Sequence, residues 1–455
     1  MSKRLEEFSI KGLYGSRNIE ASIRDNTLIL VGENGSGKTT FLRILFYLLS
    51  GRWLSLVQFQ FDSLSVTISG KRFSITHADV VDAIKETDRR TFRDIPPPLR
   101  RRIIEAIESG DVDQMPIDVE HLLMRYGISP DDVFRQMEFF DEKQKGKRGQ
   151  VQETIKQIQN SIGAKVLYLP TYRRIERELG SIFEGVDPDD IRRQKGRLPQ
   201  KRASSEAYVE LVEFGMKDVD VAVNKTVDEL KEFSRESLNN LTLKYLGDVV
   251  NREYQDVGLT GISDVSEDAI RAVLDRIHES ILTDEHKNHL FDVINSARTA
   301  DEPTEHEKII YHYFLKLLGF QESLQQKEEN IRSFCRLCSE YIVDKQFLYD
   351  STAFSFRIQP LDERNTKEVK LSDLSSGEKQ IVSLFSHLYL SGEKKYFVLI
   401  DEPELSLSVP WQRRFLLDIR EGGFCSGVVA VTHSPFIYEN DLRSYAHSIG
   451  EFVGV

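Results

Sequence analysis

The sequence is poor in cysteine and has no long apolar run. Three of its 455 residues are cysteine, which excludes a disulfide scaffold and is typical of a reducing compartment. No stretch approaches the roughly 20 apolar residues of a membrane-spanning helix. The first residues, Met1 to Glu7, contain no apolar signal-peptide core. We therefore expect a cytoplasmic protein with no membrane contact.

Positive charge is also scarce, because 61 Lys and Arg residues face 73 Asp and Glu residues and give a net charge of -12. Such a chain does not coat nucleic acid with its whole surface, although local basic segments are compatible with this balance. Residues 144–150 read as a basic loop, and residues 192–202 hold six basic side chains and no acid. We expect these two segments to contact DNA, RNA or an acidic partner; the alternative is a solvated loop.

A glycine-rich segment, residues 32–39, fits the pattern G-x-x-x-x-G-K-[ST]. The apolar residues 28–31 precede it as a predicted strand, and residues 40–49 follow with helical spacing. This is the context of a phosphate-binding P-loop, in which backbone N–H groups and a helix N-terminus surround phosphate oxygens. Lys38 would reach the β- and γ-phosphates of ATP, and the Thr39 hydroxyl would ligate Mg²⁺. The predicted cofactor-binding residues here are Gly32, Asn34, Gly35, Ser36, Gly37, Lys38, Thr39 and Thr40.

Two acids follow a second apolar run, residues 396–400. At the carboxyl end of a parallel strand beside a P-loop, Asp401 would hold Mg²⁺ through its water shell. Glu402 would orient and deprotonate the attacking water. Two solvated acids in a turn are the alternative, and the P-loop favours the catalytic interpretation.

Two further polar motifs stand at predicted element ends. Ser375, Ser376, Gly377 and Glu378 precede a helical run, residues 379–390, and would form a second phosphate-binding surface at a helix N-terminus. The same residues also read as a plain capping box, and both interpretations are compatible. His433 follows an apolar run, residues 429–431, at the end of a predicted strand.

Together these motifs resemble the ABC-type ATPase superfamily, including its SMC and RecF members. The set Leu-Ser-Ser-Gly-Glu-Lys-Gln, Asp-Glu-Pro-Glu, Thr-His-Ser-Pro and Leu-Pro-Thr-Tyr-Arg-Arg is most similar to the Septu antiphage ATPases of the PtuA type and their retron-associated relatives. The resemblance covers residues 5–76, 165–175 and 350–440. Residues 374–378, Leu-Ser-Ser-Gly-Glu, match the superfamily's signature motif. Ser376 departs from the glycine that is usual at its third position.

The resemblance implies a head-to-tail homodimer or higher oligomer, in which the signature of one subunit caps the γ-phosphate held by another. It implies that Glu402 and His433 are catalytic, and that His433 is the switch histidine, whose imidazole contacts the γ-phosphate. It also implies a defence role with a separate HNH nuclease of the PtuB type, since the chain shows no His-Asn-His motif and little sequence follows His433. A RecF- or SMC-like DNA-repair clamp is the alternative, and a transporter subunit is disfavoured by the long helical insertion.

The predicted fold is α/β: an ABC-type P-loop ATPase head with a mixed sheet and a large, mostly helical insertion. Residues 1–76 form the first part of the head and residues 344–455 the second. Between them, residues 77–343 are predicted to be helical around one core strand near 166–170. A long helical pattern covers residues 204–250, with Gly215 and Gly247 as candidate break points. Cys335 and Cys338 share an apolar helical stripe and are predicted to be core residues, not metal ligands.

Overall fold

The computed structural model describes residues 3–85, 147–170, 208–210, 216–255, 266–275, 283–299, 304–362, 368–392, 395–405 and 407–454. The chain divides into two compact units. The head unit comprises Met1–Glu213 and Glu393–Val455, and the arm unit comprises Phe214–Gly392. Each unit contains its own cluster of buried apolar side chains.

The head unit contains a six-stranded sheet in which all neighbouring strands are parallel. Its order is β12 (Ala446–Ser448), β3 (Thr27–Val31), β11 (Cys425–Thr432), β10 (Tyr396–Asp401), β6 (Lys165–Leu169) and β7 (Tyr208–Glu210). The inner strands are continuous apolar runs because both faces of a parallel sheet are covered. The carboxyl ends of β3, β10 and β11 meet at one edge, where ligands bind in open α/β sheets.

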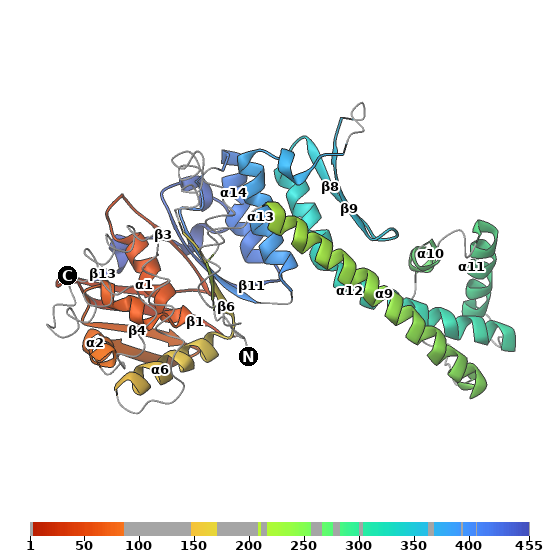
Figure 1. Ribbon diagram of the computed structural model, residues 1–455, viewed down its shortest axis with the longest axis horizontal. Coiled ribbons are helices and arrows are strands. Elements are labelled where there is room, and N and C mark those ends of the chain that lie inside the picture. The colour runs from red at the N-terminus through yellow and green to blue at the C-terminus, as the bar shows by residue number, and fades with distance from the viewer. Residues whose placement is uncertain are drawn as a thin grey trace, which may run out of the picture. The chain divides into compact units, whose positions relative to one another are not determined.

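A second sheet of the head unit is antiparallel and has five strands. Its order is β13 (Val453–Gly454), β2 (Arg17–Ser22), β1 (Leu5–Leu13), β4 (Ser63–Ile68) and β5 (Lys71–Thr76). Helix α1 (Lys38–Ser50) joins the two sheets through one core (Figure 1). It contacts β6, β10 and β11 of the parallel sheet, and the ring centroid of its Phe41 lies 5.0 Å from that of Phe8 in β1. The sequence predicts one mixed sheet in the head. The structure instead has its parallel strands in one sheet and its antiparallel strands in another. Helices α2 (His77–Lys85) and α6 (Lys147–Ile162) complete this layer.

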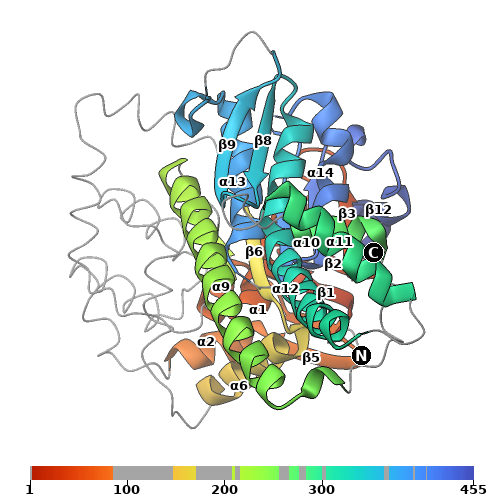
Figure 2. The ribbon, with the colours of Figure 1, turned by 90° about the vertical axis from the view of Figure 1, so that its right-hand side faces the viewer.

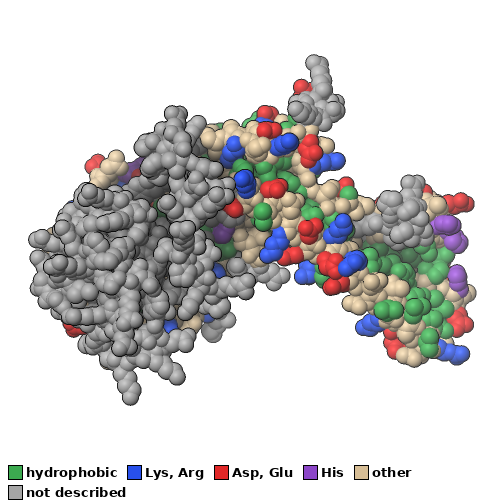
Figure 3. Space-filling model, viewed as in Figure 1, with side chains coloured by type: hydrophobic (Ala, Val, Ile, Leu, Met, Phe, Trp, Pro, Cys, Tyr) green, Lys and Arg blue, Asp and Glu red, His purple; other side chains and the backbone are tan. Residues whose placement is uncertain are grey.

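Two long helices, α9 (Met216–Val250) and α12 (Glu305–Tyr341), lie side by side in the arm unit (Figures 1 and 2). Their lengths of 35 and 37 residues correspond to about 50–55 Å at 1.5 Å per residue. Helices α10 (Glu267–Asp275) and α11 (Asp284–Thr299) pack at one end, where Figure 3 shows hydrophobic side chains. The hairpin β8 (Lys345–Asp350)–β9 (Ser355–Pro360) and helix α13 (Ser376–Leu390) complete the unit.

The predicted helix over residues 204–250 is wrong at its start, because Tyr208–Glu210 is strand β7 and α9 begins at Met216. Gly247 lies inside α9 and does not end it. Residues 147–150, predicted as part of a basic loop, form the first turn of α6. The basic segment 192–202 lies outside the described residues, and so does the Thr-Tyr-Arg-Arg part of the motif set, residues 171–174.

The two compact units also divide the chain differently from the three predicted segments. Residues 77–213 belong to the head unit, and residues 344–392, which include the predicted signature, belong to the arm unit. Cys335 and Cys338 are buried on α12, as predicted. The described residues contain no group of three or more side chains suited to hold a metal ion, and none of their helices is both long and apolar enough to span a bilayer.

Gly427 of β11 allows a close approach between neighbouring strands. A Cβ there would lie 2.4 Å from the ring of Phe397 and 2.8 Å from the carbonyl oxygen of Asn26. That carbonyl cannot retreat freely, because it accepts a hydrogen bond from Val428. We expect Gly427→Ala to destabilise the head unit by about 1–3 kcal/mol, as overpacked cores do.

Thermal unfolding of Gly427→Ala beside Gly423→Ala measures this effect. Among the described residues, no atom lies within 4 Å of a Cβ added at Gly423. Equal melting temperatures for the two variants would contradict the prediction.

Candidate nucleotide-binding site

The P-loop follows β3 and turns through glycines in the left-handed region. Gly35 has φ 77° and Gly37 has φ 95°, conformations that L side chains rarely adopt. Gly37 is the last residue before α1, so the loop leads directly into the N-terminus of a 13-residue helix. Unpaired N–H groups and the helix dipole favour an anion at this position.

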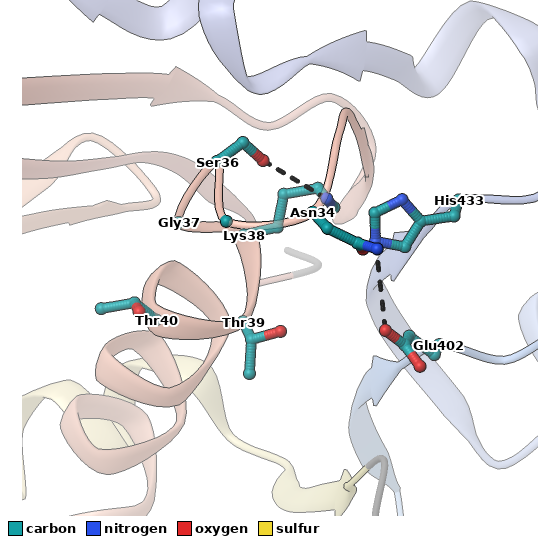
Figure 4. A pocket seen from close by; sticks show the side chains of 9 residues that line it. Asn34, Ser36, Gly37, Lys38, Thr39, Thr40, Glu402 and His433 are labelled. Carbon is teal, nitrogen blue, oxygen red and sulfur yellow. Dashed lines mark hydrogen bonds and ion pairs between the residues drawn. The ribbon is translucent and has the colours of Figure 1, made fainter.

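Lys38 is folded back onto its own loop. Its Nζ donates to the carbonyl oxygens of Gly32 at 2.8 Å and Glu33 at 2.9 Å, and to Ser36 Oγ at 3.3 Å (Figure 4). The residue is only 4% exposed, and this burial lowers the pKa of its ammonium group. Nearby carboxylates, led by Glu402, oppose that shift. The loop therefore holds a cation at its centre by charge-assisted hydrogen bonds.

Thr39 and Asp401 meet although 362 residues separate them. The Thr39 hydroxyl donates to Asp401 Oδ1 at 3.2 Å. Asp401 ends β10 and is 1% exposed. A hydroxyl and a carboxylate oxygen side by side are hard ligands of the kind Mg²⁺ prefers, so these two residues fit the predicted metal site.

Glu402 lies in the left-handed region with φ 50°, unusual for a residue other than glycine. Its backbone N–H donates to the carbonyl of Val431 at 2.8 Å, which fixes the turn after β10. Burial raises the pKa of its carboxyl group, and the charges of Asp401 and Glu404 add to the shift. His433 Nε2 lies 4.0 Å from Glu402 Oε1 (Figure 4). A basic carboxylate next to an imidazole is the arrangement required to orient a water molecule.

These motifs line one pocket in the head unit, formed by Asn34, Gly35, Ser36, Gly37, Lys38, Thr39, Thr40, Glu402 and His433. Figure 4 shows Glu402 and His433 facing the P-loop side chains. Gly32 and Asp401 do not line the pocket, but each is bonded to a residue that does. The structure therefore brings the predicted P-loop, paired acids and switch histidine together.

The predicted signature residues lie in the arm unit, at the N-terminus of α13. The predicted capping box is confirmed: Glu378 N donates to Ser375 Oγ at 3.4 Å, and Ser375 N donates to Glu378 Oε2 at 2.6 Å. Glu378 also pairs with Lys345 at 3.0 Å, while Ser375 and Ser376 are exposed. The contact of Ser375, Ser376, Gly377 and Glu378 with a nucleotide stays a prediction.

Sequence reasoning missed the contacts of Glu404. Its carboxylate accepts hydrogen bonds from Thr432, His433 and Ser434. The only signal in the sequence is the second glutamate of Asp-Glu-Pro-Glu, and its presence does not predict which residues donate to it.

The model of the family described as AAA ATPase domain matches residues 4–438. The chain belongs to the AAA ATPase domain family. The matched range includes every predicted site residue of this AAA ATPase domain protein, but it does not separate a PtuA-like protein from other members.

The comparison with curated proteins gives no match. Among solved structures, the AAA ATPase domain protein is similar to the Smc head domain of Pyrococcus furiosus, which was crystallised with an extended coiled coil and the C-terminal domain of ScpA. The identity is 14% and the TM-score 0.31, over 96% of this chain and 92% of that chain. Identity and TM-score are too low for this likeness to assign a function.

Proposed function

We propose that this protein binds ATP with Mg²⁺ and hydrolyses it. The observation that carries the proposal is the pocket in which Lys38, Glu402 and His433 meet. The loop amides and Lys38 would bind the phosphates, while Thr39 and Asp401 would hold Mg²⁺. When bound, Mg²⁺ would neutralise charge on the β- and γ-phosphates. Glu402 would accept a proton from the attacking water, and His433 would orient the γ-phosphate.

The active unit in this proposal is a pair of chains arranged head to tail. The signature residues belong to the arm unit, and the residues that line the pocket belong to the head unit. Exposed Ser375 and Ser376 begin a 15-residue helix whose N-terminus suits a phosphate. A γ-phosphate contacted by two chains would stabilise only the associated arrangement, so ATP would control association.

A mixing experiment tests this arrangement. Lys38→Ala disables the P-loop, and Ser376→Glu places an acid on the proposed phosphate surface, at a helix N-terminus that tolerates acids. Each variant alone is expected to be inactive. Their mixture is expected to regain roughly a quarter of wild-type hydrolysis, because half of the random dimers contain one intact composite site.

The control is Asn240→Glu, which adds an acid on an exposed position of α9 and is expected to keep wild-type hydrolysis. An inactive mixture, in which exchange of subunits is demonstrated, would exclude the composite site. Full activity of Ser376→Glu alone would exclude the signature residues from it.

We propose further that the ATPase is the sensor and scaffold of an antiphage complex and regulates a separate HNH-type nuclease. The support is the motif resemblance to PtuA-type proteins. The arm unit supports it as well, because α9 and α12 offer a long helical surface for a partner. In this division of labour all recognisable catalytic residues act on ATP and none on nucleic acid.

Purification of the protein with its operon neighbours, followed by cleavage assays at several ATP concentrations, tests the division of labour. The expected result is a co-purifying nuclease whose cutting changes with ATP. Metal-dependent cleavage by the isolated chain that survives Lys38→Ala would refute it. A complex without a nuclease that binds DNA in an ATP-dependent way would favour a RecF- or SMC-like clamp instead.

A further inference from the structure

The loop that follows β10 carries a carboxylate with a task separate from that of Glu402. We propose that Glu404 is a positioning residue: it holds the switch segment, residues 432–434, so that His433 stays opposite Glu402. The inference rests on the proposed ATPase function, because its readout is hydrolysis. Glu404 itself does not line the pocket.

Three donors of the switch segment converge on this carboxylate. Thr432 Oγ1 donates to Glu404 Oε2 at 2.7 Å. The backbone N–H of His433 donates to Oε1 at 2.7 Å, and that of Ser434 donates to the same oxygen at 3.2 Å. Hydrogen bonds to a carboxylate are about twice as strong as neutral ones, so these contacts fix the backbone that carries the imidazole.

A further hydrogen bond holds the switch segment at Ser434. Its hydroxyl donates to Gln412 Oε1 at 2.6 Å. The amide Nε2 of Gln412 in turn donates to the carbonyl of Leu407 at 2.9 Å. Gln412 belongs to α14 (Val409–Glu421), so the network joins the end of β11, the loop after β10 and this helix. The switch segment is therefore held from two sides, and Glu404 supplies three of the contacts.

The hydrogen bonds of Glu404 matter for hydrolysis because they hold the backbone of His433, which faces Glu402 in the pocket. His433 Nε2 is 4.0 Å from Glu402 Oε1, a separation that a small rotation of the switch backbone would change. Misplacement of a catalytic group by about 1 Å can cost on the order of 100-fold in rate. The position of His433 is thus set by an acid that touches its backbone and not its ring.

Replacement of Glu404 by glutamine or by alanine separates the loss of the hydrogen bonds from the loss of the charge. In Glu404→Gln the remaining oxygen can still accept both backbone N–H bonds, and the amide can donate to Thr432 Oγ1. Glu404→Ala removes all three contacts. We therefore expect the glutamine variant to retain the network and the alanine variant to lose it.

Steady-state hydrolysis and equilibrium ATP binding are measured on the full chain. For Glu404→Ala we expect kcat to fall about 10- to 100-fold while the Kd for ATP stays within about twofold, since the P-loop is untouched. Glu404→Gln should restore kcat to within about threefold of wild type. Glu439→Ala, which removes an exposed acid from a turn beyond the switch segment, is the matched control.

A double-mutant cycle separates positioning from general destabilisation. If Glu404 acts through His433, then Glu404→Ala should have little further effect in a His433→Ala background. Thr432→Val keeps the side-chain shape and removes two hydrogen bonds of Oγ1, the one donated to Glu404 and the one accepted from Ser434 N at 3.0 Å. Both backbone N–H bonds to Glu404 remain, so this variant should lower kcat less than Glu404→Ala does, again at constant Kd. If Glu404→Ala does not fold, the kcat and Kd of Thr432→Val test the inference instead.

Three results would overturn the inference. The first is a wild-type kcat in Glu404→Ala, or in Thr432→Val if the alanine variant does not fold. The second is that the effects of Glu404→Ala and His433→Ala on kcat multiply in the double variant. The third is a loss of ATP affinity as large as the loss of kcat. Failure of the proposed function looks different, because the wild-type chain would then neither bind nor hydrolyse ATP. Hydrolysis by the wild type with an unchanged Glu404→Ala variant would remove only this inference.

Discussion

Lys38→Ala is expected to weaken ATP binding by at least about 100-fold, the scale on which a buried charge partner contributes to affinity. Two carbonyls of the P-loop hold the Lys38 ammonium group in place, so its position does not have to be organised when ATP binds. Alanine leaves the loop amides but removes the positive charge at their centre. Calorimetric titration with a non-hydrolysable ATP analogue and Mg²⁺ measures the loss.

The stability of this variant separates lost binding from lost folding. Lys38 is 4% exposed, and burial of a charge costs free energy that alanine does not incur. Alanine also removes the three hydrogen bonds of Lys38 Nζ, which opposes this gain. We therefore expect a melting temperature close to that of the wild type in the absence of nucleotide. Lys11→Ala, which removes an exposed lysine of β1, serves as the control with unchanged ATP affinity. Tight ATP binding by Lys38→Ala would remove the site assignment.

The sequence predicts the separate parts of the pocket well because each part is a short local pattern. A glycine-rich turn between an apolar run and an amphipathic run predicts the P-loop without any knowledge of the fold. The contact between Thr39 and Asp401 is different, since it depends on the order of strands in the sheet. Strand β11 separates β3 from β10, and no pattern in the chain encodes that order.

The errors of the sequence-based prediction have physical causes. Apolar spacing of three and four residues places α9 correctly but does not fix its first residue, so the pattern alone does not separate strand β7 from the helix. The three residues of β7 are strand because they pair with β6, a tertiary contact that overrides local preference. The contacts of Glu404 could not be predicted for the same reason, because its donors lie at and just after the end of β11, 28 to 30 residues away.

Glu402→Gln is expected to slow ATP hydrolysis by about 100- to 10,000-fold, the usual contribution of a positioned general base. Glutamine has the same shape as glutamate and fits the turn after β10, but its amide cannot accept a proton. The P-loop, Lys38 and the Thr39–Asp401 pair are unchanged, so the variant should retain ATP affinity within about threefold. Single-turnover hydrolysis and equilibrium binding of ATP distinguish the two quantities. Glu421→Gln, at an exposed acid of α14, is the matched control.

The same variant tests what ATP does to the assembly. With bound ATP retained, Glu402→Gln should accumulate the associated state, because a γ-phosphate contacted from two chains favours that state and is no longer removed. Sedimentation velocity with ATP and Mg²⁺ should then show a larger species that is absent without nucleotide. Addition of Ser376→Glu to Glu402→Gln should abolish this species while ATP binding persists, since the acid acts at the exposed N-terminus of α13 and not in the pocket. Wild-type hydrolysis by Glu402→Gln would reassign the general base, and association that survives Ser376→Glu would place the contact between chains elsewhere.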